Sequence, residues 1–357
     1  MILTHERRDV FLPLSETGMP KNTWQRLNVL GVTTLQELRD LWAYGPRELL
    51  ASYLEDSPVR LLSQRVAAGV TRGGTASGPL GTINLAAAGR TPRLVRRARG
   101  VILSSAQRRK PAELPDPLPA AGHRRANTRP KHLIDRFPKA RDQGQRGTCV
   151  AFTSTSFLEY HLFSDSNQRK RRSEQFAFWA CKQADGLPSI DGTHVRVARD
   201  VLTKKGACLN KTWVYESYPV GVTVHQGPPP KGAETEALES RWPKARRLAA
   251  KNPEKLCESI DEQRPVVLSV KTFPNWDYPN VEASGEIQMP LPLESPDGAH
   301  AICVVGYEKR PDVPGGGIFI FRNSWGEDWA KRAGRFGGGY GTLYFDYTRK
   351  YGMEAFH

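Results

Sequence analysis

The sequence predicts an α+β fold, because its last two thirds place helices first and strands afterwards. A helical stretch begins at Cys149, and strand-like runs follow between residues 265 and 347. Helices and strands separated in this way indicate a helical subdomain and an antiparallel β subdomain, whereas alternating units would indicate a parallel sheet. A small all-α domain and a basic linker precede this part. The expected boundaries are 1–70 for the helical domain, 71–130 for the linker and 131–357 for the α+β domain.

The first domain has the apolar spacing of short helices. In LPLSETGMPKNTWQRLNVLGVTTLQELRDL, leucines and a tryptophan recur at helical intervals. Gly31 ends one predicted helix, and Thr34 caps the next, with Glu37 three residues later. One or two further short helices are expected over residues 43–68.

The linker carries most of the net charge. Residues 90–141 contain 15 basic and 3 acidic side chains, which accounts for +12 of the formal +15. Glycine, proline, alanine and arginine dominate residues 71–130, so an extended or disordered chain is expected. Two short apolar stretches, at 94–95 and 101–103, are candidates for docking on another part of the protein. A solvated tether is the simplest interpretation, and a salt-sensitive arm for nucleic acid or another polyanion is a second one.

The α+β domain shows a clear succession of elements. Helices are expected from Cys149 onward and around 174–184, 195–205 and 252–262. Strands are expected at 265–273, 299–308, 317–325 and 339–347.

Composition excludes several classes of protein. Mean hydropathy is -0.52, and no apolar run reaches the ~18–20 residues that a membrane-spanning helix needs. Charges stand where a signal peptide has its apolar stretch, so we expect a cytoplasmic protein. Five cysteines without a close CxxC pair argue against a disulfide framework or a zinc site. We expect no metal, no organic cofactor and no membrane partner.

Cys149 is a candidate nucleophile because of its position. Gly144 and Gly147 mark an irregular loop, and a helix begins directly after them. Unpaired N–H groups and the dipole at a helix N-terminus stabilise a thiolate, which is the nucleophilic form of cysteine. The alternative is a small buried residue at the start of a helix.

His300 and Asn323 could complete such a site. His300 lies within a predicted strand beside Gly298 and Ala299, which leave room for a second side chain. Asn323 follows another buried-looking strand, where its amide could accept an imidazole N–H and fix the ring. Trp325 could cover that hydrogen bond. The alternatives are a core histidine and a turn asparagine.

Four motifs in order, QGQRGTC, SEQF, GAHAICVVGY and RNSWGEDW, resemble the papain-like cysteine peptidases. The resemblance covers about residues 130–350. It implies a papain-like fold of two subdomains and a thiol protease that cuts protein or peptide substrates. The order of Cys149, His300 and Asn323 along the chain matches that family and differs from the caspases, in which the histidine precedes the cysteine.

The resemblance also implies roles for individual residues. Cys149 matches the nucleophile, His300 the general base and acid, and Asn323 the orienting amide. Gln143 matches the glutamine whose side chain completes the oxyanion hole. Candidate substrate-binding residues are Asp191, Gly192, Thr193, Val266, Ala301 and Trp325. Arg146 stands where secreted members have a disulfide cysteine, so that crosslink is absent.

Two further expectations concern the N-terminal part. Residues 1–70 resemble helix-hairpin-helix units, through Leu30-Gly31-Val32 and Thr34-Leu35, and a docking module for a protein partner of residues 10–70 is favoured over a DNA-binding one. Relatives in the peptidase family carry an N-terminal pro-segment that blocks the cleft, and residues 80–135 occupy that position. The expected function is an endopeptidase regulated or targeted by its N-terminal domain. The alternatives are an adaptor or nucleic-acid-tethered binding module with a peptidase fold, and an acyl transferase that uses the same Cys-His pair.

Overall fold

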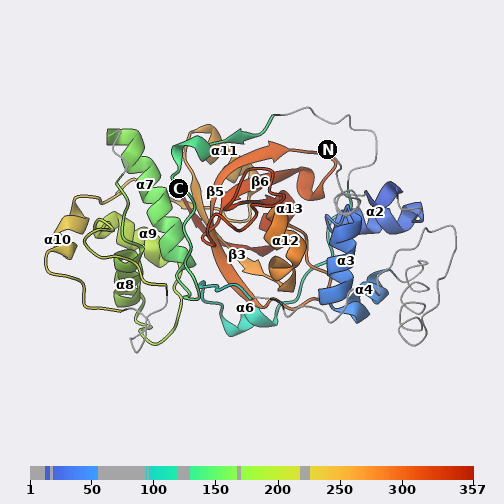
Figure 1. Cartoon of the computed structure of the whole chain (residues 1–357), viewed down its shortest axis with the longest axis horizontal. Helices are drawn as coiled ribbons and strands as arrows, with labels where there is room; N and C mark the ends of the chain where they lie inside the picture. Colours follow the sequence, from blue (N-terminus) through green and yellow to red (C-terminus); the bar gives the residue numbers. More distant parts are fainter. Residues whose placement is uncertain are drawn as a thin grey trace, which may run out of the picture.

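The computed structural model describes residues 13–16, 19–54, 94, 96–118, 129–166, 170–217 and 226–357. A sheet lies at the centre, with a group of helices at one end and a second, N-terminal group of helices at the other (Figure 1). Within the described part of the chain, no helix is both long enough and apolar enough to traverse a bilayer.

The helical subdomain is built around one buried helix. Helix α7 (Cys149–Ser166) is apolar on several sides, and its first two turns are buried. Helix α8 (Glu174–Asp185) is capped by Ser173, whose Oγ accepts the Phe176 N–H, and it ends at Gly186 in the left-handed conformation. The remaining helices are α9 (Val195–Lys204) and α10 (Ala233–Leu238). The three larger helices lie in the expected positions.

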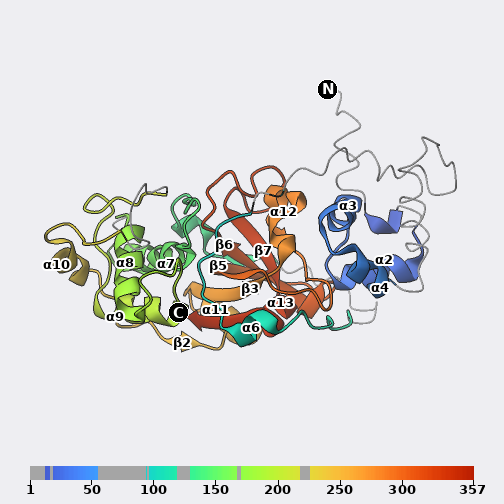
Figure 2. The same cartoon turned by 90° about the horizontal axis from the view of Figure 1, so that it is seen from below.

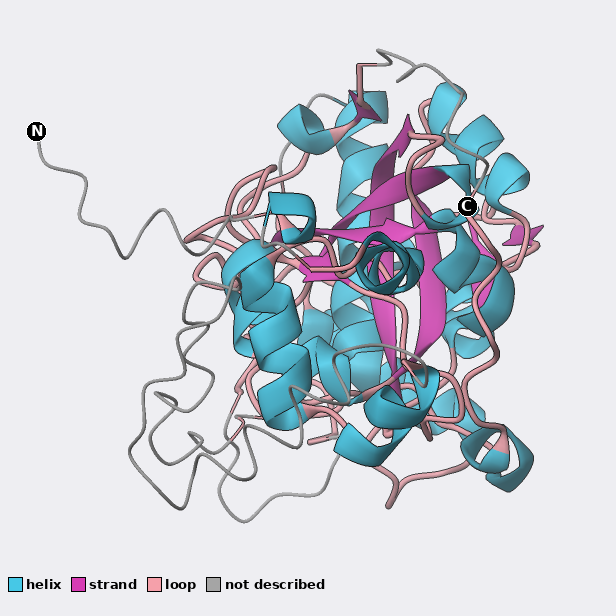
Figure 3. Ribbon diagram, turned by 90° about the vertical axis from the view of Figure 1, so that its right-hand side faces the viewer, coloured by secondary structure: helices cyan, strands magenta, loops and turns pink. Residues whose placement is uncertain are grey.

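Among the described residues, eight strands form one sheet in the order β2-β8-β3-β5-β6-β7-β4, with β1 also paired to β5. Pairing is antiparallel except between β4 and β7. The strands are β1 (Lys131–His132), β2 (Arg247–Leu248), β3 (Val266–Thr272), β4 (Glu286–Ile287), β5 (Gly298–Lys309), β6 (Gly317–Arg322), β7 (Tyr340–Tyr344) and β8 (Gly352–Phe356). The four expected strands correspond to β3, β5, β6 and β7. Figure 3 shows the strands side by side with helices around them.

The sheet separates two apolar cores. Alternate residues of β3 face opposite ways, so Val266 and Leu268 enter the larger core while Val267 enters the core shared with the helical subdomain. Three helices flank the strands: α11 (Pro253–Asp261), α12 (Pro279–Ser284) and α13 (Phe345–Tyr351). Because α7 packs on β5, the N-terminus of α7 is fixed beside one end of the sheet.

The N-terminal module, residues 13–16 and 19–54, contains α2 (Lys21–Val29), α3 (Leu35–Tyr44) and α4 (Arg47–Tyr53). Thr34 and Glu37 form the expected capping box at the start of α3. Gly31 has a φ of +77° and follows the end of α2, so the chain turns where a side chain would be strained. The predictions for residues 55–68 lie outside the described residues.

Residues 96–118, here called the strap, run along the face of the α+β domain and contain the short helix α6 (Ser105–Arg109). Figure 2 shows the strap passing beneath the sheet region toward the N-terminal helices. Val101 and Leu103 are buried in the core shared with the helical subdomain. The sequence predicted an extended or disordered linker here, with residues 101–103 as a candidate for docking, and this part of the linker is packed on the protein.

Candidate active site

His300 and Asn323 form the best-defined pair of the site. His300 lies on β5, and Asn323 directly follows β6, the neighbouring strand. The imidazole Nε2 lies 2.8 Å from Asn323 Oδ1, and that oxygen also accepts the Ser324 N–H at 2.8 Å. Since the amide oxygen is an acceptor in both contacts, Nε2 carries the proton and Nδ1 presents a lone pair. Within the described residues, Nδ1 has no hydrogen-bond partner.

Tryptophan rings enclose this pair. Trp325 lies 4.6 Å from the imidazole between ring centroids, and Trp276 lies 5.8 Å from it. Both His300 and Asn323 are almost fully buried. Burial lowers the pKa of His300 to about 3, the Asn323 hydrogen bond opposes that shift, and the positive charge of Arg99 adds to it. The imidazole is therefore neutral in this arrangement.

Cys149 opens α7 and is fully buried. Its Sγ accepts the N–H of Gly100, a strap residue, at 3.2 Å. Burial raises the pKa of the thiol to about 11, against the opposing effect of hydrogen bonds from the backbone of Ala301, Gly100 and Val150. The sequence predicted a thiolate at a helix N-terminus. Under the strap, desolvation outweighs the helix dipole, and the sulfur is a protonated thiol.

Hydrogen bonds hold Gln143 in a single orientation. Its Oε1 accepts the Ser324 hydroxyl at 2.6 Å, and its backbone N–H donates to the Ser324 carbonyl at 2.9 Å. The side-chain amide group therefore points its N–H bonds toward the carbonyl oxygens of Arg146, at 2.7 Å, and Ala98, at 3.2 Å. Trp325 Nε1 donates to the same Ala98 oxygen at 3.3 Å. Two donors thus converge on a carbonyl oxygen of the strap.

The Asp191-Gly192-Thr193 segment pairs with the strap. Thr193 N–H donates to the Gly100 carbonyl at 2.8 Å, and Ile102 N–H donates to the Thr193 carbonyl at 3.3 Å. Gly192 has a φ of +137°, and an added Cβ would come within 2.7 Å of the Gly100 oxygen. The Asp191-Gly192-Thr193 segment therefore pairs by backbone hydrogen bonds with an extended part of the strap.

A buried ion pair contacts the Asp191-Gly192-Thr193 segment. Lys182 Nζ lies 2.9 Å from an Asp185 carboxylate oxygen and donates to the Gly192 carbonyl at 2.7 Å. The Thr193 hydroxyl donates to the same carboxylate at 2.8 Å. Since both charged side chains are buried, removing either would leave the other without its partner. Lys182 and Asp185 both lie on α8, and the sequence analysis did not identify either as a functional residue.

Arg99 anchors the strap beside the imidazole. Its guanidinium contacts Asp277 at 2.8 Å and Asp297 at 2.9 Å, and all three side chains are at most 11% exposed. The neighbouring Arg97 pairs with Glu282 of α12, and its N–H donates to Asp277 at 3.2 Å. The sequence places Arg97 and Arg99 within the predicted basic linker. Their carboxylate partners lie about 180 residues away in the chain, and no local pattern signals such pairings.

The structure separates two of the predicted substrate-binding residues. Ala301 belongs to the core beside Cys149, whereas Val266 faces the larger core on the other side of the sheet. Trp325 lies against His300 and the strap, as described above. Arg146, which replaces a disulfide cysteine, is buried and donates to Gln175 at 2.8 Å and to the Glu216 carbonyl at 2.9 Å. All five cysteines are free and buried.

Known proteins share this architecture. A family model described as papain family cysteine protease matches residues 125–352, well over half of the chain. The chain belongs to this family. An uncharacterized peptidase C1-like protein of Acanthamoeba polyphaga mimivirus is 25% identical to this papain-family protein over 224 residues, covering 57% of this chain and 69% of its own. Xylellain, a cysteine protease from Xylella fastidiosa, superposes with a TM-score of 0.56 at 20% identity, covering 74% of this chain and 97% of its own.

The predicted papain-like α+β fold is thereby confirmed, and the protein is a cysteine peptidase that acts on proteins or peptides. The family match begins at residue 125, so the helix-hairpin-helix likeness of residues 1–70 stays a prediction. Among the described residues, no group of three or more His, Cys, Asp or Glu side chains could hold a metal ion.

Proposed function

We propose that this papain-family protein is a cysteine endopeptidase with Cys149, His300, Asn323 and Gln143 as its machinery. The observation that carries the proposal is the hydrogen-bonded His300–Asn323 pair, which leaves Nδ1 without a partner among the described residues, together with the contact of the Cys149 thiol with the backbone of Ala301, the residue after His300. The Nδ1 lone pair can accept the proton of the Cys149 thiol. A nucleophile, a base and a group that orients the base are the elements that covalent catalysis requires.

The reaction follows from these positions. Cys149 Sγ attacks the peptide carbonyl carbon while its proton passes to His300 Nδ1, and negative charge develops on the carbonyl oxygen. The Gln143 amide donates to that oxygen. His300 then protonates the leaving amine as the C–N bond breaks, and water, deprotonated by the same ring, releases the acyl group and restores the thiol. Asn323 keeps Nε2 protonated throughout.

We further propose that the strap holds this peptidase inactive. The strap places the Gly100 N–H on the sulfur, and the converging donors of Gln143 and Trp325 hold the Ala98 oxygen. A trans peptide directs its C=O opposite to its N–H, so the Arg99 carbonyl oxygen points away from Sγ. The strap peptide whose N–H contacts Cys149 is therefore not the peptide whose oxygen accepts from Gln143. The strap would block substrate without being cut at that point.

The N-terminal module is positioned to control the strap. Asp40 of α3 accepts the Asn280 N–H at 2.6 Å, at the start of α12, and Met289 N–H donates to the Leu30 carbonyl at 2.9 Å. Arg97 of the strap pairs with Glu282 in the same short helix. Module and strap therefore share α12 as a support. A protein partner that displaces the module would disturb α12 and weaken the strap's ion pairs.

The location proposed for the protein is a reducing compartment such as the cytoplasm. Five free, buried cysteines support it, because disulfides dominate in oxidising compartments. Binding of nucleic acid or another polyanion at residues 71–130 stays a prediction.

An adaptor function is the second candidate, because Cys149 is covered in the structure. If the cover is permanent, no substitution in the strap will produce hydrolysis. If the cover is regulatory, loosening it will produce hydrolysis that Cys149→Ala abolishes. An acyl transferase would be recognised in the same assay, because added amines would appear in the products.

A further inference from the structure

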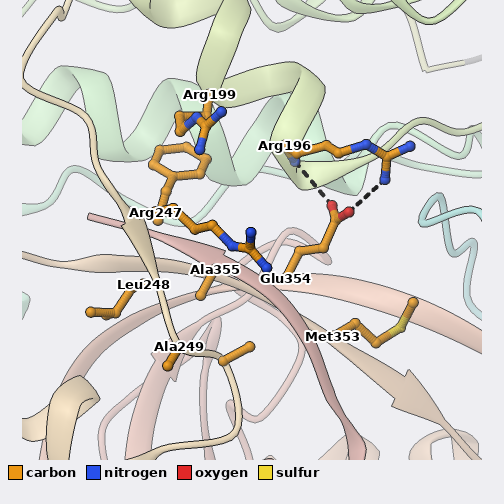
Figure 4. A pocket seen from close by; sticks show the side chains of 10 residues that line it. Arg196, Arg199, Arg247, Leu248, Ala249, Met353, Glu354 and Ala355 are labelled. Carbon is orange, nitrogen blue, oxygen red and sulfur yellow. Dashed lines mark hydrogen bonds and ion pairs between the residues drawn. The ribbon is translucent and has the colours of Figure 1, made fainter.

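A pocket separate from the peptidase cleft lies between α9, β2 and β8. Its volume is about 560 Å³, within the range of small-molecule sites. Figure 4 shows arginine side chains at its upper side and small apolar side chains along the strands. The lining residues are Arg196, Arg199, Arg247, Leu248, Ala249, Ala250, Met353, Glu354, Ala355 and Phe356.

The three guanidinium groups differ in what they contact. Arg196 pairs with Glu354 at 2.5 Å, and its backbone N–H donates to the same carboxylate at 3.0 Å. Arg199 pairs with Asp200 at 2.8 Å. Arg247 forms no side-chain hydrogen bond or ion pair with any residue that the structure describes. Among the arginines of this lining, Arg247 is thus the one without a direct ion pair to a described residue.

The rest of the lining is apolar. Leu248 and Ala249 lie on the β2 side, and Met353, Ala355 and Phe356 on the β8 side. A ligand that satisfies both parts needs one negative charge and an apolar body. A carboxylate fits the charge better than a phosphate dianion, because only one guanidinium of this lining lacks a direct ion pair to a described residue, and its two oxygens match the arginine fork.

We propose that this pocket binds an organic carboxylate, with the carboxylate on Arg247 and the apolar body against Met353. The chemistry is available from two sources, a free small acid or the C-terminus of a peptide that ends in apolar residues. The proposal uses neither Cys149 nor His300, so it stands or fails independently of the peptidase assignment.

The test uses the full chain with Cys149→Ala, so that peptides are not cleaved. Binding of 4-phenylbutyrate is measured by calorimetry and by ligand-observed NMR, beside its uncharged amide. We expect saturable binding of the acid and at least ~10-fold weaker binding of the amide. Arg247→Gln should weaken binding of the acid by ~10-fold or more. Arg246→Gln is the matched control, because Arg246 is also exposed but donates to the Pro243 carbonyl at 2.6 Å.

Three results would overturn the proposal: no saturable binding of the acid, equal binding of the amide, or equal loss in the Arg246→Gln and Arg247→Gln proteins. The source of the ligand is settled with acetyl-Ala-Leu-Phe, used with a free or an amidated C-terminus. Binding of the free-carboxylate peptide ~10-fold tighter than phenylbutyrate assigns the pocket to peptide C-termini. Weaker or equal binding assigns it to small acids.

Discussion

Replacing Gly100 by alanine should displace the strap and expose Cys149. Gly100 lies where the strap crosses Cys149, and a Cβ built on Gly100 would come 1.8 Å from the Gly147 carbonyl oxygen. Ordinary contacts of this kind begin at 3.4 Å, and the obstacle is backbone that cannot rotate away. Gly100→Ala must therefore displace the strap by more than an ångström.

The displacement breaks two contacts that hold the strap down. The Gly100 N–H would lose Cys149 Sγ, and the Gly100 carbonyl would lose the Thr193 N–H. Each hydrogen bond contributes ~1 kcal/mol, and overpacking adds ~1–3 kcal/mol. The closed arrangement should therefore be destabilised by about 3–5 kcal/mol, which corresponds to at least about a 100-fold larger open fraction.

The assay is the rate at which iodoacetamide alkylates Cys149, followed by peptide mass spectrometry. While the closed form predominates, this rate is proportional to the open fraction, so Gly100→Ala should raise the rate at least about 100-fold. Arg108→Ala is the control, because Arg108 is an exposed strap residue without a contact to the cleft. Equal alkylation rates in the wild-type and Gly100→Ala proteins would refute the account of the strap.

Three other predictions follow from the same geometry. In the Gly100→Ala background, Asn323→Ala should reduce kcat/KM less than His300→Ala does, because Asn323 acts through the ring; the reverse order in peptide hydrolysis would contradict its orienting role. Arg99→Ala should raise the Cys149 alkylation rate at least ~10-fold, because Asp277 and Asp297 lose their cation. A rate equal to that of Arg108→Ala would show that the Arg99 ion pairs do not hold the strap over Cys149. Burial raises the pKa of Asp40 to about 6, so the folded protein binds a proton that the unfolded chain releases, and stability falls as the pH rises from about 4 to about 6. The Asp40→Asn protein should therefore have a free energy of unfolding up to about 3 kcal/mol higher than wild type at pH 8, and the two proteins should be equally stable at pH 4. Urea unfolding at both pH values measures this difference. The same difference at pH 4 and pH 8 would contradict the prediction.

The sequence was sufficient for elements whose signals are local. The capping box at Thr34 and Glu37 predicts the start of α3 because both partners lie within one turn. Strands β3 and β5 could be predicted because apolar runs of that length, next to turn residues, are typical of buried strands. The grouping of His300 with Asn323 could be predicted from ordered motifs and a family resemblance, since composition alone does not place two strands side by side.

Docking of residues 101–103 was a candidate from the sequence, but the path of the strap could not be predicted in the same way. Its position depends on pairs such as Arg99–Asp277, which are separated by 178 residues, and on backbone hydrogen bonds that leave no side-chain pattern. For the same reason, the sequence suggested a thiolate at Cys149. The thiol pKa of about 11 arises from burial beneath Gly100 and its neighbours, which only the folded arrangement reveals. Val266 was predicted to bind substrate but enters the larger core. Side chains alternate along a strand, so a shift of one residue decides which core a side chain enters.

The most direct test of the central claim is peptide hydrolysis by three full-length proteins: wild type, Gly100→Ala, and Gly100→Ala with Cys149→Ala. Each is incubated with a peptide library, and new termini are identified by mass spectrometry. The account predicts little cleavage by wild type, strong cleavage by Gly100→Ala and none by the double variant. Cleavage that persists in the double variant would show that Cys149 is not the nucleophile. Failure of the Gly100→Ala protein to cleave, with Cys149 open to alkylation, would show that the fold serves binding instead.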